Sequence, residues 1–227
     1  MHPGMRKTAA LAIVTIGALL APRPAAALPG FTLAATTPRL SFYTRGPAVD
    51  VAGIEASLTR IEGTLDTHLA GHASYYRYTS AQEVAAGTGH YADGVTFAGQ
   101  VHSTRERHDH ELVHLVAAQM GDPGRFFQEG LAVALTDDSR GLRKAAKKAL
   151  SGGLTVARFV TAFDAQDQGA AYAVAGTFVR HLVDAYGIDK VRAFYRAARS
   201  EASVRGSFAA AFGQDLDPAL AAWRADL

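Results

Sequence analysis

The chain has 227 residues, which is enough for one domain with a sizeable core and short for two. Hydrophobic residues make up 48% and charged residues 19%, a balance that excludes a disordered chain. The formal net charge is only +2 and there is no cysteine, so neither a strongly basic nucleic-acid-binding protein nor a disulfide-linked domain is indicated.

The first 27 residues have the pattern of a secretory signal peptide. Arg6 and Lys7 provide a positively charged start, Ala9–Leu20 is an almost continuous apolar run, and alanines precede the expected cleavage point after Ala27. The run is shorter than the about 20 apolar residues that cross a bilayer. We therefore expect residues 28–227 to be exported to the periplasm, the cell envelope or the exterior, with no membrane span after cleavage. An uncleaved N-terminal anchor is the alternative.

The positive charge of the chain belongs to this segment. Arg6, Lys7 and Arg23 are its charged residues, and without them Lys and Arg number one fewer than the 21 acidic residues. The remaining chain has no excess of basic residues with which to bind nucleic acid. Without disulfides, an exported domain has to be stabilised by core packing, with or without a metal ion.

Residues 39–102 alternate between predicted strands and helices. Alternating apolar side chains with many aromatics predict strands, and apolar residues at spacings of three and four predict helices. We expect strands at Arg39–Arg45, Ala73–Thr79 and Val95–His102, and helices at Asp50–Leu69 and Ala81–Ala86. Three glycines mark residues 87–94 as a loop, and Gly99 is a candidate bulge in the third strand.

Almost everything after Ser103 has a helical pattern. Ser103 and Glu106 have the spacing of a capping box, which predicts a helix that begins near Thr104. The expected helices cover residues 104–120, 126–135, 140–150, 171–186, 188–198, 204–212 and 218–225. Early strands followed by late helices indicate a single α+β domain over residues 28–227, with a small sheet packed on a helical half.

The sequence H-E-L-V-H at residues 110–114 places metal-binding chemistry on the first of these helices. Residues four apart share a helical face, so His110 and His114 can direct their imidazoles at one ion. Glu111 is rotated by about 100° from His110, which suits a base acting on a metal-activated water rather than a ligand. Exposed histidines with ordinary contacts are the alternative.

A third ligand is expected from the next helix, in F-F-Q-E-G-L-A at residues 126–132. The six residues after His114 descend by about 9 Å, a turn at Gly121–Gly124 reverses the chain, and the residues up to Glu129 climb by about 7 Å. Glu129 therefore returns to the level of the histidines. Two imidazoles and one carboxylate are the donor set of a catalytic Zn²⁺ site.

These blocks resemble the gluzincin metallopeptidases, and within them the peptidase MA-like proteins. The likeness also includes Y-A-V-A-G-T-F-V-R-H-L-V-D-A-Y-G at residues 172–187, and it covers about residues 38–198. It implies a zincin-like fold, with a small mixed N-terminal sheet, a metal-bearing active-site helix and a helical C-terminal half. It also implies one Zn²⁺ bound by His110, His114 and Glu129, with Glu111 as the general base of peptide hydrolysis.

The chain departs from this family at two places. Members often have Trp before the E-G pair, where this chain has Phe126 or Phe127. Thermolysin-type enzymes have an acidic residue one helical turn after the ligand glutamate, where this chain has Val133. A hydrogen-bonding partner for a ligand histidine must then come from elsewhere, and Asp137 and Asp138 are candidates.

The resemblance also indicates how a substrate is held. Tyr172 is a candidate donor to the oxygen of the attacked carbonyl, although it can equally be an ordinary core or surface aromatic. The predicted strand Val95–His102 corresponds to the sheet edge that pairs with an extended peptide or protein substrate in zincins. An ordinary strand that ends the sheet is the alternative.

Two other functions are compatible with the same residues. A zinc ion can stabilise an exported domain without catalysis, and the site can hydrolyse a non-peptide amide, such as a cell-wall component. The presence of Glu111 favours catalysis, because a structural site does not need it and prefers a fourth protein ligand. We therefore expect an exported zinc metallopeptidase that acts on peptide or protein substrates.

Overall fold

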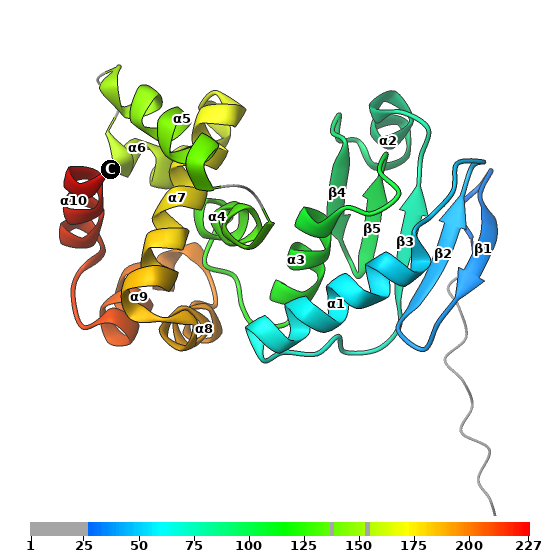
Figure 1. The fold of residues 1–227 in the computed structure, drawn as a ribbon, viewed down its shortest axis with the longest axis horizontal. Coiled ribbons are helices and arrows are strands. Elements are labelled where there is room, and N and C mark those ends of the chain that lie inside the picture. Colours follow the sequence, from blue (N-terminus) through cyan, green and yellow to red (C-terminus); the bar gives the residue numbers. More distant parts are fainter. Residues whose placement is uncertain (1–26, 137–138, 153–154) are drawn as a thin grey trace, which may run out of the picture.

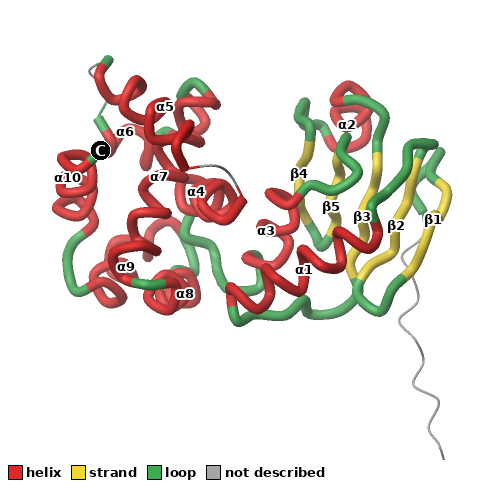
Figure 2. The backbone as a smooth tube through the Cα atoms, in the orientation of Figure 1, coloured by secondary structure: helices red, strands yellow, loops and turns green. Residues whose placement is uncertain are grey.

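The computed structural model describes residues 27–136, 139–152 and 155–227. This part of the chain divides into a sheet half (residues 27–120) and a helical half (residues from 121 onward), which lie side by side (Figure 1). Figure 2 shows the strands gathered on one side of the molecule and most of the helices on the other. The α+β prediction is therefore confirmed. The predicted signal peptide, apart from Ala27, lies outside the described residues.

Five strands form one mixed sheet in the order β1-β2-β3-β5-β4. β2, β3 and β5 are parallel neighbours, and β1 and β4 run antiparallel at the two edges. The strands are β1 (Thr32–Thr36), β2 (Leu40–Thr44), β3 (Ala73–Arg77), β4 (Gly94–Phe97) and β5 (Gln100–Ser103). In the described part of the chain, nothing pairs with the outer edge of β4.

The two faces of the sheet are covered by different elements, because successive side chains of a strand point to opposite faces. Phe42, Tyr75 and Val101 belong to the main core, together with α1 (Val51–Leu65) and α3 (Asp109–Ala117). On the other face, Tyr43 and Tyr76 form a smaller cluster with Val84 of α2; that helix spans Ala81–Thr88. Helix α3, which carries His110 and His114, therefore lies between the sheet and the helical half (Figure 1).

Helices α4 to α10 pack around a core rich in phenylalanine. None of the described helices is both long and apolar enough to cross a membrane. The helices are α4 (Arg125–Thr136), α5 (Ser139–Ser151), α6 (Val156–Thr161), α7 (Gln168–Tyr186), α8 (Ile188–Ala197), α9 (Val204–Phe212) and α10 (Leu216–Asp226).

Two glycines bring α4 and α7 close together. A Cβ atom at Gly130 would lie 2.8 Å from the carbonyl oxygen of Ala175, and one at Gly176 would lie 2.2 Å from Cγ1 of Val133. Both separations are shorter than van der Waals contact, so the crossing has room for glycine alone. This crossing fixes α4, and with it Glu129, against the longest helix of the chain.

The prediction of one strand over Val95–His102 was wrong. The segment is a hairpin in which β4 and β5 are joined by a turn at Ala98 and Gly99, both with positive φ, 49° and 73°. Positive φ at both central residues is typical of the tight turn that joins two antiparallel strands. Ala98 hides this turn from sequence analysis, because Asn or Asp is the usual signal at that position. The edge strand is therefore only Gly94–Phe97.

Helix α3 begins later than the predicted capping box. Ser103 is the last residue of β5, and its hydroxyl accepts a hydrogen bond from the amide of Arg105 and lies 2.9 Å from Nδ1 of His108. Helix α3 starts only at Asp109 and ends at Ala117, which leaves 104–108 as a connection. The Ser103 side chain thus stabilises the turn that leads into the helix. The predictions also lacked β1 and α6.

Candidate metal centre

Three side chains from two helices converge on one point. Nε2 of His110 lies 3.1 Å from Nε2 of His114, and both nitrogens lie 3.1 Å from Oε2 of Glu129. His110 and His114 are one turn apart on α3, and Glu129 comes from α4. This group can hold a metal ion. The sequence prediction that these three side chains meet is confirmed.

The spacing of the donor atoms fits a small divalent ion. With bonds of about 2.0–2.2 Å, tetrahedral coordination separates its ligand atoms by about 3.3–3.6 Å, and the three atoms here form a slightly smaller triangle with edges of 3.1 Å. When Nε2 of both histidines is unprotonated, each of the three atoms offers a lone pair, and the three lone pairs face one another. A cation between them satisfies all three at once, whereas a single proton does not.

The carboxylate of Glu129 is held from both sides. Its Oε2 faces the histidines, and its Oε1 lies 3.1 Å from Nη2 of Arg125. The Nε of the same arginine lies 3.1 Å from Oδ1 of Asp164. Burial alone would raise the pKa of Glu129, but the hydrogen bonds to His110 and His114 outweigh it and hold this pKa well below its ordinary value. Glu129 is therefore ionised at neutral pH, as a metal ligand must be.

The pKa of His114 is shifted in the opposite direction, upward. Burial lowers its pKa, but the hydrogen bond and the charge of Glu129 outweigh burial and raise it in the metal-free site. A proton and a metal ion thus compete for the same nitrogen, so metal binding releases a proton.

Glu111 lies beside this group without belonging to it. Its side chain is only 6% exposed, and its Oε2 accepts a hydrogen bond of 2.8 Å from the hydroxyl of Thr96 on β4. A Cβ atom at Gly94 would lie 2.8 Å from Cγ of Glu111 and 2.4 Å from Nδ1 of His108, so glycine lets β4 approach α3. The edge strand therefore fixes the carboxylate that is expected to act as the base.

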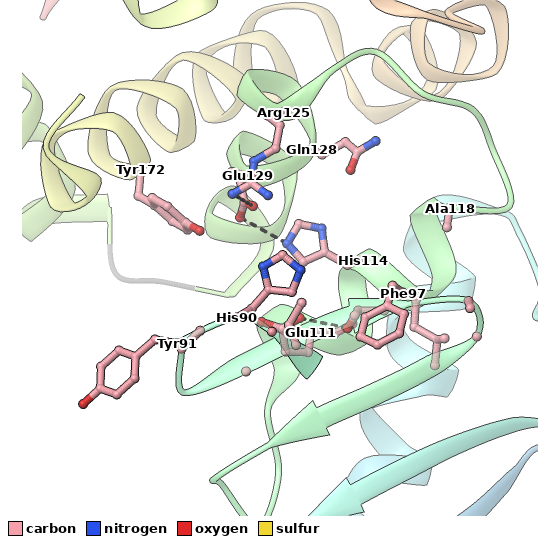
Figure 3. Close-up of a pocket in the computed structure, with 18 of the residues that line it drawn as sticks. His90, Tyr91, Phe97, Glu111, His114, Ala118, Arg125, Gln128, Glu129 and Tyr172 are labelled. Atoms are coloured by element: carbon pink, nitrogen blue, oxygen red, sulfur yellow. Dashed lines mark hydrogen bonds and ion pairs between the residues drawn. The ribbon is translucent and has the colours of Figure 1, made fainter. Parts of the chain in front are cut away.

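A cleft of about 410 Å³ opens at this point. It is lined by Glu111 and His114 of α3, Glu129 of α4, Tyr172 of α7 and the segment 89–99 that leads into and through β4. Figure 3 shows the side chains of His114 and Glu129 directed at one another and Glu111 at the foot of the cleft. The cleft thus combines two of the three metal-binding side chains, a separate carboxylate and the open edge of the sheet.

Tyr172 is also at this site. Its ring is stacked on that of His110, with 5.8 Å between the centroids and 26° between the planes. Burial and the charge of Glu129 raise the pKa of Tyr172 to about 12, so its hydroxyl keeps its proton at neutral pH. His181, farther along α7, lines a different cavity, beside Trp223.

The departure at Val133 has a structural reason. Val133 is buried and packs on Gly176 of α7, on the side of α4 that faces the helical half. An acidic residue there would be buried in the contact with α7 and would lose its hydration. Asp137 and Asp138, the candidate replacements, lie outside the described residues.

Sequence analysis missed three residues of the site. Arg125 holds Glu129, and their spacing of four residues on one helix was the available signal. Thr96 of β4 donates a hydrogen bond to Glu111 of α3, and no pattern in the local sequence predicts this contact. His90 directs its ring into the cleft in Figure 3, from a loop that sequence analysis had identified only by its glycines.

Comparison with known proteins does not assign this chain to a family: no family model, no curated protein and no solved structure matches it.

Proposed function

We propose that this chain is an exported zinc-dependent peptidase of the gluzincin, peptidase MA-like kind, with a zincin-like fold. One observation carries the proposal: Glu111 lines the same cleft as His114 and Glu129 but stands outside the group that these two form with His110. Three protein ligands with a nearby free carboxylate are typical of catalytic zinc sites, while structural sites use four ligands.

The proposed reaction is hydrolysis of a peptide bond by water. A Zn²⁺ ion bound by His110, His114 and Glu129 would polarise the carbonyl group and acidify a water molecule. Glu111 takes the proton of that water and delivers it to the nitrogen of the leaving amine. Thr96 occupies only Oε2 of Glu111, which leaves Oε1 for this exchange.

Tyr172 supports the same reaction from the other side of the cleft. Because its pKa is raised to about 12, its hydroxyl is a hydrogen-bond donor at neutral pH. We propose that it donates to the carbonyl oxygen of the substrate as negative charge develops there. Its stacking on His110 holds the ring in place.

The open edge of β4 is the proposed binding site for the substrate backbone. Gly94–Phe97 pairs with β5 on one side only, and this strand lines the cleft that holds the ligand group. An extended peptide added to the edge is held by main-chain hydrogen bonds, which give affinity without demanding a particular sequence.

The proposal is tested first by the metal content of the chain and then by replacement of Glu111 with glutamine. Elemental analysis of the purified chain should find one zinc per molecule, and a chelator should abolish cleavage of a peptide library. Glu111→Gln should retain zinc and lose hydrolysis, by about 10²-fold or more, because its amide cannot accept the proton. Glu106→Gln, an exchange on the preceding connection, is the matched control and should change neither. Zinc binding with no hydrolysis of any peptide would favour a structural zinc site or a non-peptide amide substrate.

A further inference from the structure

Three large apolar or aromatic side chains are conspicuously exposed in the described part of the chain, and two of them line the cleft. Tyr91 is 80% exposed and Phe97 is 42% exposed, and both line it. The third, Leu33, is 51% exposed and lies on β1, at the opposite edge of the sheet. Single exposed apolar side chains are ordinary, whereas several on one concave surface mark a binding site.

The two aromatic residues lie at the two ends of the edge strand. Tyr91 precedes β4, and Phe97 is its last residue. Figure 3 shows them on either side of Glu111, with the hydroxyl of Tyr91 directed away from Glu129. Their Cα atoms are at most about 20 Å apart, a distance that about six residues of extended peptide cover.

Phe97 is fixed before any substrate arrives. Its ring is stacked on His102 with 4.9 Å between centroids and 5° between planes, and His102 is stacked in turn on Tyr76. Because side chains alternate along a strand, Val95 and Phe97 share the face of β4 opposite to Thr96. A peptide paired with the edge of β4 places every second side chain on that same face, beside the exposed part of the Phe97 ring.

Tyr91 offers the complementary contact. Its ring is almost free of protein contacts, so nothing in the described chain covers its apolar surface. A ring of this kind has few rotatable bonds, so it binds an apolar side chain with little loss of conformational entropy.

We infer that Tyr91 and Phe97 are specificity-determining residues that bind large apolar or aromatic side chains of an extended peptide on either side of the cleaved bond. This inference rests on the proposed peptidase function. The substrates are therefore unfolded or extended segments rich in apolar residues, rather than highly charged ones.

The experiment uses the zinc-loaded chain and a library of synthetic peptides blocked at both ends. Sequencing of the products should show enrichment of Phe, Tyr, Leu, Ile or Met within about three positions of the cut. Tyr91→Ser and Phe97→Ser should each lower kcat/KM for the best peptide by about 5–20-fold, chiefly through KM, because each removes apolar contact area. Leu33→Ser is the matched control, an exposed apolar side chain at the far edge of the sheet, and should change kcat/KM by less than about twofold.

Two further measurements separate substrate contact from damage to the fold. Tyr91→Phe and Phe97→Tyr should retain the wild-type preference, and all variants should bind one zinc. In the inert Glu111→Gln background, Tyr91→Ser should weaken binding of the same peptide by the same factor as it raises KM. Tyr91 is exposed enough that its substitution leaves Tm unchanged, which keeps the test valid even where Phe97→Ser loosens the ring stack.

The outcomes distinguish the two proposals. A zinc-loaded wild-type chain that cleaves no peptide overturns the peptidase function, and this inference with it. Cleavage without apolar preference, or Tyr91→Ser and Phe97→Ser variants that behave like Leu33→Ser, overturns the inference and leaves the peptidase standing.

Discussion

His102 and the pair His110 and His114 have different kinds of hydrogen-bonding partners. His102 lies between the rings of Tyr76 and Phe97, with its Nδ1 2.9 Å from the hydroxyl of Tyr78 and its Nε2 3.2 Å from Oε1 of Gln100. Because an amide oxygen only accepts, Nε2 donates to Gln100 and the Tyr78 hydroxyl donates to Nδ1. Both ring nitrogens of His102 therefore have protein partners.

The Nε2 atoms of His110 and His114 are placed differently. They face each other and the same oxygen of Glu129, so three acceptors share one small space once both Nε2 atoms are unprotonated, as metal binding requires. A histidine whose two nitrogens are paired by the protein is part of the architecture. Histidines whose lone pairs converge on a carboxylate await a cation, and this contrast distinguishes a structural histidine from a ligand.

The largest expected effect is loss of the metal ion on replacement of Glu129. Glu129→Gln keeps the size of the side chain but removes its charge, so zinc affinity should fall by more than the about 10–100-fold typical of losing a partner of a ligand. His102→Gln should leave zinc affinity unchanged within about twofold, since it has no place in the ligand group. Competition titration with a chelating dye measures both, and equal losses would erase the distinction between the two groups of histidines.

A smaller effect is expected at Arg125, which touches the ligand Glu129 and not the metal position. Arg125→Met should weaken zinc binding by about 10–100-fold, because it removes the ion pair that orients the carboxylate. Arg205→Met is the control, since Arg205 forms an exposed ion pair with Asp217 rather than with Glu129. The same titration applies, and unchanged affinity in Arg125→Met would show that α4 alone holds the carboxylate.

The smallest expected effect is the response of the metal-free fold to acid. Burial lowers the pKa of His102 to about 4, against about 6.5 in the unfolded chain, so the unfolded chain takes up the proton first as pH falls. The contribution of His102 to the free energy of unfolding is complete above about pH 6.5 and is lost between about pH 6.5 and 4. It amounts to about 1–2 kcal/mol once residual solvation is allowed for.

Urea unfolding of the metal-free chain from pH 4 to 8 measures this loss. His102→Gln should flatten the slope below about pH 6.5, while His108, whose pKa burial lowers to about 3, continues to contribute in both chains. His114 has the opposite sign: its raised pKa gives stability below about pH 6.5 that is lost as the pH rises. An identical slope in wild type and His102→Gln would mean that His102 is solvated in the folded chain.

Most of the fold was predictable because its signals are local. Apolar periodicity identified α1, α4, α7, α8 and α9 close to their observed bounds. The failures occurred where a distant contact decides the local structure. The Ala98–Gly99 turn depends on pairing between β4 and β5, and the late start of α3 depends on a Ser103 side chain used by the connection rather than by the helix.

The ligand group was predictable for the same reason. His110 and His114 share a face by helical geometry, and a short reversal brings Glu129 back to their level. The residues around this group were not predictable from the sequence. Thr96 contacts Glu111 from β4, and Asp164, which follows α6, contacts Arg125. Such contacts are set by tertiary packing, which spacing along the chain does not reveal.

The ligands come from opposite sides of the boundary between the two halves: α3 belongs to the sheet half, and α4 is locked to α7 by Gly130 and Gly176. A bound ion would therefore cross-link the two halves. The ion would bind only while the two halves are in contact in this arrangement. Separation of the halves would therefore release the ion, even if each half remained folded.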